Sequence, residues 1–398
     1  MMKIGILTFH RPANFGANLQ AYCSMCYLRS LGYEAKVIDY VRAGDLEYRK
    51  QVDAKQYEAH KSFVETRLNL TKQATTSEDL SRIVEEEHFD AIVVGADAVW
   101  RSPNDSNIYF AEWLFKSPEL SGIPVASISP AHMGDGFTAL SDARQEAIKN
   151  CLLKFKYITV RDEWTKKVIN RDLFNGKEYI TRVNPDPVFT MYRNVNDEIW
   201  DGRGRKEKAY YLMSLPKDWA SGGKFGAKKI RWFANFKACV NMVGYELVEL
   251  PIPEGRSGMP FDYTVDYPID PIQWFLWIKN AKAFCGLRFH AIVSAISSGT
   301  PFYSMDSYGD NGRISQILDI LGLHKIARTR DAKSKIYNLL KGSSFETNRC
   351  NALIEFESAR KVFNALESTT RDDVVRFRDM NIAIFEDNMA EMLKAISE

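Results

Sequence analysis

Cysteine is scarce in this sequence, with six residues among 398. A disulfide-stapled secreted fold is therefore excluded, and a reducing compartment, the cytoplasm, is the expected location. Long apolar runs are also missing: no stretch approaches the roughly 18 residues that a membrane span needs. The start of the chain becomes polar too soon for a signal peptide. An excess of charge of one sign is absent as well, because 53 basic and 51 acidic residues leave a formal net charge of +2.

These absences narrow the class of protein. Basic residues do not alternate repeatedly with aromatic ones, so we expect no nucleic-acid partner. The six histidines lack the spacing of metal ligands, and Cys23 and Cys26 have no second cysteine pair, so we expect no metal. With 45% hydrophobic and 26% charged residues, the chain has an ordinary globular composition. Its length predicts two or three domains.

Strand and helix patterns alternate along the first half of the chain. Residues 4–8, 17–31 and 34–40 predict one strand–helix–strand unit, the start of a parallel sheet. The long charged stretch 42–87 predicts helix, with Thr76 or Ser77 as an N-cap. Further strands are predicted over residues 89–95, 125–129, 157–160 and 179–183, and further helices over residues 141–156 and 163–170. We therefore predict a Rossmann-like domain over residues 1–200.

A second alternation follows the polar segment 201–208, which contains no hydrophobic residue and predicts an interdomain link. Strands are predicted over residues 210–213, 246–250, 281–285 and 301–304, and helices over 228–243, 271–278 and 291–298. Residues 209–343 then form a second Rossmann-like domain, and residues 344–398 a helical C-terminal tail. The expected fold is α/β, with two Rossmann-like domains that face a cleft.

The most informative motif is Arg288-Phe289-His290, where a predicted strand gives way to a predicted helix. On an extended connection, side chains two residues apart point the same way. Here they would point toward the carboxyl edge of a parallel sheet, where ligands bind. A guanidinium, an imidazole and a helix N-terminus would then converge on an anion. In the alternative interpretation, Arg288 pairs with a surface carboxylate and His290 caps its own helix.

Two further charged residues follow predicted strands. Arg161 precedes a predicted helix for which Asp162 is a suitable N-cap. Substrate binding and a local ion pair with Asp162 or Glu163 explain the position of Arg161 equally well. Asp186 lies between two prolines, which fix its backbone. That pattern is as typical of a structural turn as of a binding residue.

Polar residues also follow two strands of the first domain. The turn after residues 4–8 contains His10, Asn14 and Gly16. Such turns bind phosphates or sugar hydroxyls, although the full glycine motif of dinucleotide-binding domains is missing. Asp97 and Trp100 follow the strand predicted over residues 89–95, and a carboxylate beside an indole suits the hydroxyls and C–H faces of a sugar. Trp100 could instead be a core residue.

Several segments occur in a fixed order: residues 3–10, 14–22, 93–100, Val160-Arg161-Asp162, 186–189 and Leu287-Arg288-Phe289-His290. Together they resemble the polysaccharide pyruvyl transferase family. The resemblance spans roughly residues 3–305, and the combination is more specific than any single motif. It implies a fold of the glycosyltransferase GT-B type, with the acceptor on the N-terminal domain and the donor on the C-terminal domain.

The resemblance also implies a reaction and roles for residues. A pyruvyl group would pass from phosphoenolpyruvate, a co-substrate, to a sugar of a polysaccharide or of its carrier-linked precursor, forming a pyruvate ketal without a cofactor. By position, Arg288 and His290 match the family's Arg-x-His element of the donor site. Arg161 matches the arginine of its Val-Arg-Asp/Glu element. Asp97 and Trp100 match a Gly-Ser-Asp-x-x-Trp segment, in which this chain has alanine for serine.

The charge of the donor agrees with this assignment. Phosphoenolpyruvate carries close to three negative charges, so several cationic groups are needed to hold it. Arg161, Arg288 and His290 could supply them. We expect His290 to protonate the methylene carbon and Asp97 to accept a hydroxyl proton. A positioned acid or base contributes on the order of 10²–10⁴-fold to such a step.

Two alternatives belong to other classes of protein. One is a GT-B glycosyltransferase that uses a nucleotide sugar, and the other is a non-catalytic glycan-binding protein of the same fold. In each case the expected partner is a saccharide. A lipid-carrier-linked acceptor would be compatible with peripheral membrane association, and the sequence leaves a homo-oligomer open.

Overall fold

In the computed structural model, which describes residues 1–101, 108–133, 136–221, 223–305 and 359–398, the chain forms two units. The first comprises Met1–Lys50, His60–Asn194 and Met380–Glu398, and the second Gln51–Ala59 and Val195–Asp379. Residues 195–200, which the sequence assigns to the first domain, thus belong to the second unit. The sequence also does not predict that residues 51–59 belong to the second unit, although the residues on either side of them belong to the first. Nor does it predict that residues 380–398 return to the first unit after residues 195–379 of the second.

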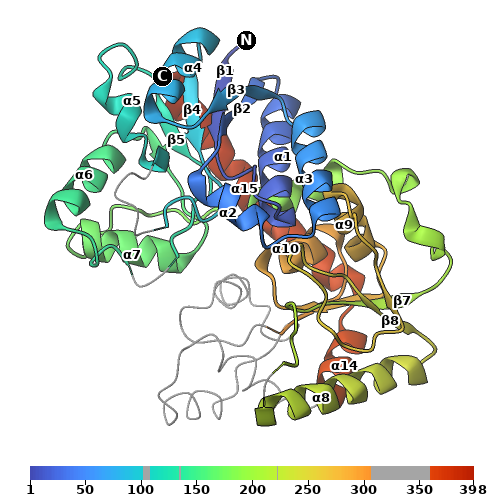
Figure 1. Ribbon diagram of the computed structural model, residues 1–398. Helices are drawn as coiled ribbons and strands as arrows, with labels where there is room; N and C mark the ends of the chain where they lie inside the picture. The colour runs from blue at the N-terminus through green and yellow to red at the C-terminus, as the bar shows by residue number, and fades with distance from the viewer. Residues whose placement is uncertain (102–107, 134–135, 222, 306–358) are drawn as a thin grey trace. The chain divides into compact units, whose positions relative to one another are not determined.

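The first unit contains a parallel six-stranded sheet in the order β3-β2-β1-β4-β5-β6 (Figure 1). Its central strands are apolar on both faces, and Ile4, Ile6 and Val93 have no exposed surface. A parallel sheet covered on both faces requires such continuous apolar strands. The strands are β1 (Lys3–Leu7), β2 (Glu34–Tyr40), β3 (Leu70–Ala74), β4 (Ala91–Val94), β5 (Val125–Ser127) and β6 (Tyr157–Ile158).

Several helices of the first unit begin at residues whose side chains cap them. Thr76 and Asp79 form a capping box at the start of α4, and the Asp162 carboxylate accepts from Thr165 N–H at the start of α7. The predicted caps Thr76 and Asp162 are therefore confirmed. The helices are α1 (Phe15–Ser30), α2 (Ala43–Arg49), α3 (Ala54–Arg67, shared with the second unit), α4 (Ser77–Glu87), α5 (Glu112–Lys116), α6 (Asp142–Leu152) and α7 (Glu163–Leu173), with the 3₁₀ helices η1 (Ile108–Phe110) and η2 (Pro187–Arg193).

The second unit contains a parallel five-stranded sheet in the order β11-β10-β7-β8-β9. All five residues of its central strand β7 are buried. On this sheet α8 lies beside α14 (Figure 1), and the two helices share an apolar core with the strands. The elements are β7 (Tyr210–Ser214), β8 (Glu246–Glu249), β9 (Tyr263–Thr264), β10 (Ala283–Gly286), β11 (Phe302–Ser304), α8 (Gly223–Met242), α9 (Pro271–Lys279), α10 (Phe289–Ser298), α14 (Ala359–Ser368), η3 (Asp197–Ile199) and η4 (Gly202–Gly204).

The described C-terminal segment, residues 359–398, is predominantly helical, as predicted. Residues 306–358, which belong to the predicted second domain and tail, lie outside the described residues. The last helix, α15 (Arg371–Ser397), has residues in both units. Its C-terminal part packs on the first unit, where Phe385 meets the ring of Tyr27 edge-on and Asn388 accepts from the Tyr157 hydroxyl. Among the described helices, none has both the length and the apolar character required to cross a membrane.

Two predicted elements are wrong. The stretch 42–87 is not helical throughout, because β3 interrupts it. Lys72 and Gln73 of this edge strand are exposed, so the sequence of β3 lacks the alternation of apolar and polar residues that is typical of a strand. Its pairing with β2 decides its conformation. Residues 179–183 form no strand: only Val183 makes an isolated bridge, to Val160.

Candidate functional site

The sheet of the first unit brings the predicted polar residues to one edge. His10 follows β1, Asp97 follows β4 and Arg161 follows β6. All three strands are parallel, so their carboxyl ends lie at the same edge. Asp186 joins them from the N-terminus of η2, where its carboxylate accepts from Val188 N–H. The prediction that each of these residues follows a strand is confirmed for His10, Asp97 and Arg161, and it is wrong for Asp186, because residues 179–183 form no strand.

Arg161 is buried between two carboxylates. Its Nη1 lies 3.2 Å from Oδ2 of Asp186 and 3.5 Å from Oδ1 of Asp97. Arg161 is 1% exposed, Asp186 is fully buried, and the Asp97 side chain is 15% exposed. With both carboxylates ionised, the three groups sum to one negative charge. The positive charge of Arg161 is therefore compensated by Asp97 and Asp186, and not by the predicted local partners Asp162 or Glu163; its binding of substrate stays a prediction.

The backbone at Asp97 directs its carboxylate toward this arginine. Gly95 has φ +115°, and a Cβ there would lie 2.1 Å from the carbonyl oxygen of Ile128, so only glycine fits between β4 and the segment after β5. Asp97 itself has φ +67°, a left-handed conformation that aspartate tolerates better than most residues. Its Oδ1 accepts from Ala98 N–H at 2.7 Å. Of the two carboxylates beside Arg161, that of Asp97 is the less buried.

His10 is buried and already has two partners. Its Nδ1 lies 3.0 Å from the carbonyl oxygen of Thr8 and its Nε2 lies 2.9 Å from Oδ1 of Asp39. Asp39 is the penultimate residue of β2 and also accepts two hydrogen bonds from the Arg11 guanidinium. Burial alone would raise the pKa of Asp39, but the hydrogen bonds from Arg11 and His10 outweigh it and lower the pKa to about 2. In this structure His10 links the segment after β1 to Asp39 of β2. Its role as a substrate ligand stays a prediction.

The low pKa of Asp39 has a consequence for stability. Because the folded-state pKa lies below the ordinary value of 3.8, the ionised carboxylate stabilises the fold above about pH 4. This stabilisation is lost as the pH falls toward 2. We expect Asp39→Asn to lower the free energy of unfolding by about 2 kcal/mol at pH 7 and by less at pH 3. Urea unfolding at both pH values measures this, and an equal loss at both would contradict it.

Asn14 and Gly16 form the start of α1. The Asn14 side chain is the N-cap, and its Oδ1 accepts from Gly16 N–H at 2.9 Å and from Ala17 N–H at 3.2 Å. Gly16 is buried in the first turn. These contacts explain both residues as helix-start residues, and their binding of substrate remains a prediction.

Trp100 belongs to the core. It has no exposed surface, its ring stacks on Phe110 with centroids 5.6 Å apart, and its Nε1–H donates to the carbonyl oxygen of Tyr109 at 3.0 Å. An indole that is enclosed on all sides cannot offer a face to a sugar. The expectation that Trp100 stacks on the acceptor is therefore wrong, and the core interpretation holds. The reason is that residues 108–110 fold back over it, which the local sequence does not reveal.

In the second unit, Arg288 and His290 lie at the carboxyl end of β10 and the N-terminus of α10. Arg288 is the N-cap, with its side chain 46% exposed, and its Nη2 donates to Oε1 of Glu254 at 2.9 Å. His290 is half-buried, with its ring edge-on to that of Phe289. The helix begins two residues earlier than predicted, so His290 lies in its first turn and not on an extended connection. The Arg288 carbonyl oxygen causes this, because it accepts from the N–H groups of Ala291 and Ile292.

Sequence reasoning missed Glu254, which lies in the segment after β8. A buried carboxylate fixes that segment: Oε1 of Glu249 accepts from Ser257 N–H at 2.7 Å, and its Oε2 accepts from the Thr264 hydroxyl at 2.9 Å. The ion pair between Glu254 and Arg288 agrees with the alternative interpretation of the sequence, in which Arg288 pairs with a carboxylate. A Glu-Gly pair between predicted strands, Glu254-Gly255, was the available signal for a turn. The comparable signal for Asp39 is a carboxylate directly after the apolar pair Val37-Ile38, near the end of the predicted strand.

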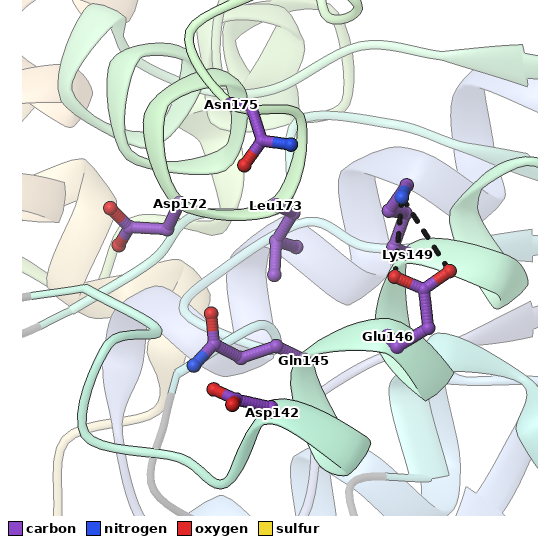
Figure 2. Close-up of a pocket in the computed structure, with 7 residues that line it drawn as sticks. All are labelled: Asp142, Gln145, Glu146, Lys149, Asp172, Leu173 and Asn175. Atoms are coloured by element: carbon purple, nitrogen blue, oxygen red, sulfur yellow. Dashed lines mark hydrogen bonds and ion pairs between the residues drawn. The ribbon is translucent and has the colours of Figure 1, made fainter.

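A pocket of about 170 Å³ opens between α6 and α7 of the first unit (Figure 2). It is smaller than the roughly 300 Å³ at which ligand pockets begin. Figure 2 shows Lys149 directed at Glu146, with which it forms an ion pair at 3.2 Å. The lining residues are Asp142, Gln145, Glu146, Lys149, Asp172, Leu173 and Asn175. None of the predicted site residues is among them, and three carboxylates do not suit an anionic donor.

Solved structures with the same architecture define the class of fold. A UDP-GlcNAc 2-epimerase from Neisseria meningitidis bound to UDP-GlcNAc is 10% identical, with a TM-score of 0.52 over 97% of this chain and 100% of that chain. An MnaA–UDP co-structure from S. aureus is 11% identical, with a TM-score of 0.52 over 100% of this chain and 98% of that chain. At such identities the likeness concerns the fold alone. The chain has an α/β fold of the GT-B type, as predicted.

The particular family follows from the sequence. A profile of the polysaccharide pyruvyl transferase family matches residues 14–308, well over half of the chain. The chain therefore belongs to the polysaccharide pyruvyl transferase family, and the predicted resemblance is confirmed. A search among curated proteins finds no match. The matched range contains Asp97, Arg161, Asp186, Arg288 and His290.

Proposed function

We propose that the protein transfers a pyruvyl group from phosphoenolpyruvate to a sugar of a polysaccharide, or of its carrier-linked precursor in the cytoplasm, and forms a pyruvate ketal. Membership of the family supports pyruvyl transfer to a saccharide. The position of Arg288 is the observation that carries the assignment of the donor. Its half-exposed guanidinium stands at the N-terminus of a ten-residue helix, and among the described residues only Glu254 is bonded to it. Guanidinium and helix N-terminus both favour an anion.

The reaction needs two proton transfers from or to side chains, and the proposal assigns them to His290 and Asp97. His290 donates a proton to the methylene carbon of the donor, which leaves cationic character at C2. One sugar hydroxyl attacks C2 and gives its proton to Asp97. Phosphate then leaves with the electron pair of its bond to C2, the second hydroxyl closes the ketal ring, and the proton that this hydroxyl loses passes to the departing phosphate. The products are the ketal and inorganic phosphate.

Arg161 acts in this proposal as a positioning residue. Its buried guanidinium holds the Asp97 carboxylate at 3.5 Å, while Asp186 on its other side balances the arginine. With both carboxylates ionised, the three groups together carry one negative charge. The same charge disfavours binding of a triply anionic donor at Arg161.

Phosphate release tests the proposal. The purified chain is incubated with phosphoenolpyruvate and a panel of saccharides, and the products are analysed by mass spectrometry. We expect phosphate release that depends on the acceptor, with a product heavier by one pyruvate less one water. In parallel, UDP-sugars replace phosphoenolpyruvate as the donor. Consumption of a UDP-sugar without use of phosphoenolpyruvate would favour a glycosyltransferase, and saccharide binding without phosphate release would favour a glycan-binding protein.

A further inference from the structure

The two arginines that the sequence assigns to the donor are compensated in the structure. Arg161 has two carboxylates beside it, and Arg288 has Glu254. Phosphoenolpyruvate carries close to three negative charges, and such a ligand is held by several charge-assisted hydrogen bonds. Arg288 opposed by Glu254 does not supply that charge. If the carboxyl edge of the second sheet holds the donor, a further cation is needed near Arg288.

Lys217 lies at this edge, beside the segment that carries Glu254. It follows β7, which pairs in parallel with β10, so the two strands end on the same side of the sheet. The methylene groups of Lys217 pack over Gly255: a Cβ on that glycine would lie 2.9 Å from Cδ of the lysine. Gly255 adjoins Glu254, whose carboxylate is bonded to Arg288. The Lys217 side chain therefore packs on the residue next to Glu254, the partner of Arg288.

Backbone hydrogen bonds hold Lys217 in this place. Asp218 N–H donates to the carbonyl oxygen of Arg256 at 3.3 Å, and Trp219 N–H donates to that of Ser257 at 3.2 Å. The residue is exposed, and no group in the described part of the chain forms an ion pair with its ammonium. The stem is thus fixed by packing, while the charge stays available to a ligand.

We infer that Lys217 is a second donor-binding residue, which binds the phosphate group of phosphoenolpyruvate; this inference rests on the proposed function. The phosphate carries the larger share of the donor's charge, and lysine binds phosphate as a mobile point charge. The planar fork of Arg288 matches a carboxylate in two parallel hydrogen bonds. The two cations therefore divide the two anionic groups of the donor between them.

Calorimetric titration of phosphoenolpyruvate into the full chain tests this inference. Lys217→Met keeps the packing over Gly255 and removes the charge. We expect it to raise the Kd about 10-fold, which corresponds to about 1.4 kcal/mol. The matched control is Lys282→Met, because Lys282 is also exposed but precedes β10 and lies at the opposite, amino edge of the same sheet. It should leave the Kd unchanged.

Two single-group probes identify the anion that Lys217 binds. Inorganic phosphate should lose affinity in Lys217→Met, whereas pyruvate should not, and the reverse result would overturn the assignment to phosphate. Equal Kd values for Lys217→Met and Lys282→Met would overturn the inference while wild-type binding leaves the proposed function intact. A wild-type chain that does not bind phosphoenolpyruvate would overturn the proposed function itself. If Lys217→Met does not fold, Lys217→Gln serves with the same expectation.

Discussion

Replacing Arg288 with alanine should lower kcat/KM for phosphoenolpyruvate about 10³-fold and leave the free energy of unfolding almost unchanged. A positioned donor that faces developing charge is worth about 10²–10³-fold in rate, and loss of donor binding adds to this. The side chain is 46% exposed and its ion pair with Glu254 is partly solvated. Exposed pairs contribute only about 0–1 kcal/mol to stability.

Steady-state phosphate release and urea unfolding measure the two effects separately. Arg376→Ala is the matched control, because Arg376 belongs to the same unit and forms an exposed ion pair, with Asp373. It should change neither quantity appreciably. An Arg288→Ala chain that unfolds, or that keeps wild-type turnover, would remove Arg288 from the donor site.

Replacing Arg161 with alanine, unlike replacing Arg288, should destabilise the protein and lower the free energy of unfolding by about 3–5 kcal/mol. Removing one partner of a buried ion pair leaves an uncompensated charge in the interior. Here two carboxylates would remain, of which Asp186 is fully buried. Activity should fall as well, because Asp97 loses the group that orients it.

Asp186→Asn in the Arg161→Ala background separates charge from packing. The second substitution removes the buried carboxylate charge, so the double variant should be more stable than Arg161→Ala alone. Denaturant unfolding of the four chains of this cycle gives the coupling energy. If Arg161→Ala instead unfolds like wild type and loses only affinity for phosphoenolpyruvate, Arg161 is the donor ligand that the sequence suggests.

The two arginines illustrate how burial separates residues that look alike in sequence. Each follows a strand of a parallel sheet and precedes a helix. Arg161 is enclosed with Asp97 and Asp186, and Arg288 remains half exposed with one carboxylate. Charge that is balanced inside the protein orients other groups, whereas charge that reaches solvent can bind a ligand. The expected mutational effects differ for this reason.

Much of the fold was predictable because its determinants are local. Apolar runs and helical spacing predict the central strands and most helices, since the pattern within each segment reflects its own burial. The strand ends that carry Asp97, Arg161 and Arg288 followed from the same patterns. Strand β3 escaped prediction because its pairing with β2, and not its own composition, makes it a strand. Trp100 escaped because residues distant from the motif enclose it.

By itself, the sequence determined the α/β class, the strand ends that hold polar residues and membership of the family. Only the tertiary structure decided which charges meet. Asp186 is 25 residues from Arg161 along the chain and Glu254 is 34 from Arg288, so neither pair belongs to one local pattern. Lys217 belongs to no sequence motif. It is a candidate for donor binding only because β7, which precedes it, lies beside β10, which precedes Arg288. Local periodicity reports burial, but the partner of a charge depends on how separate segments pack.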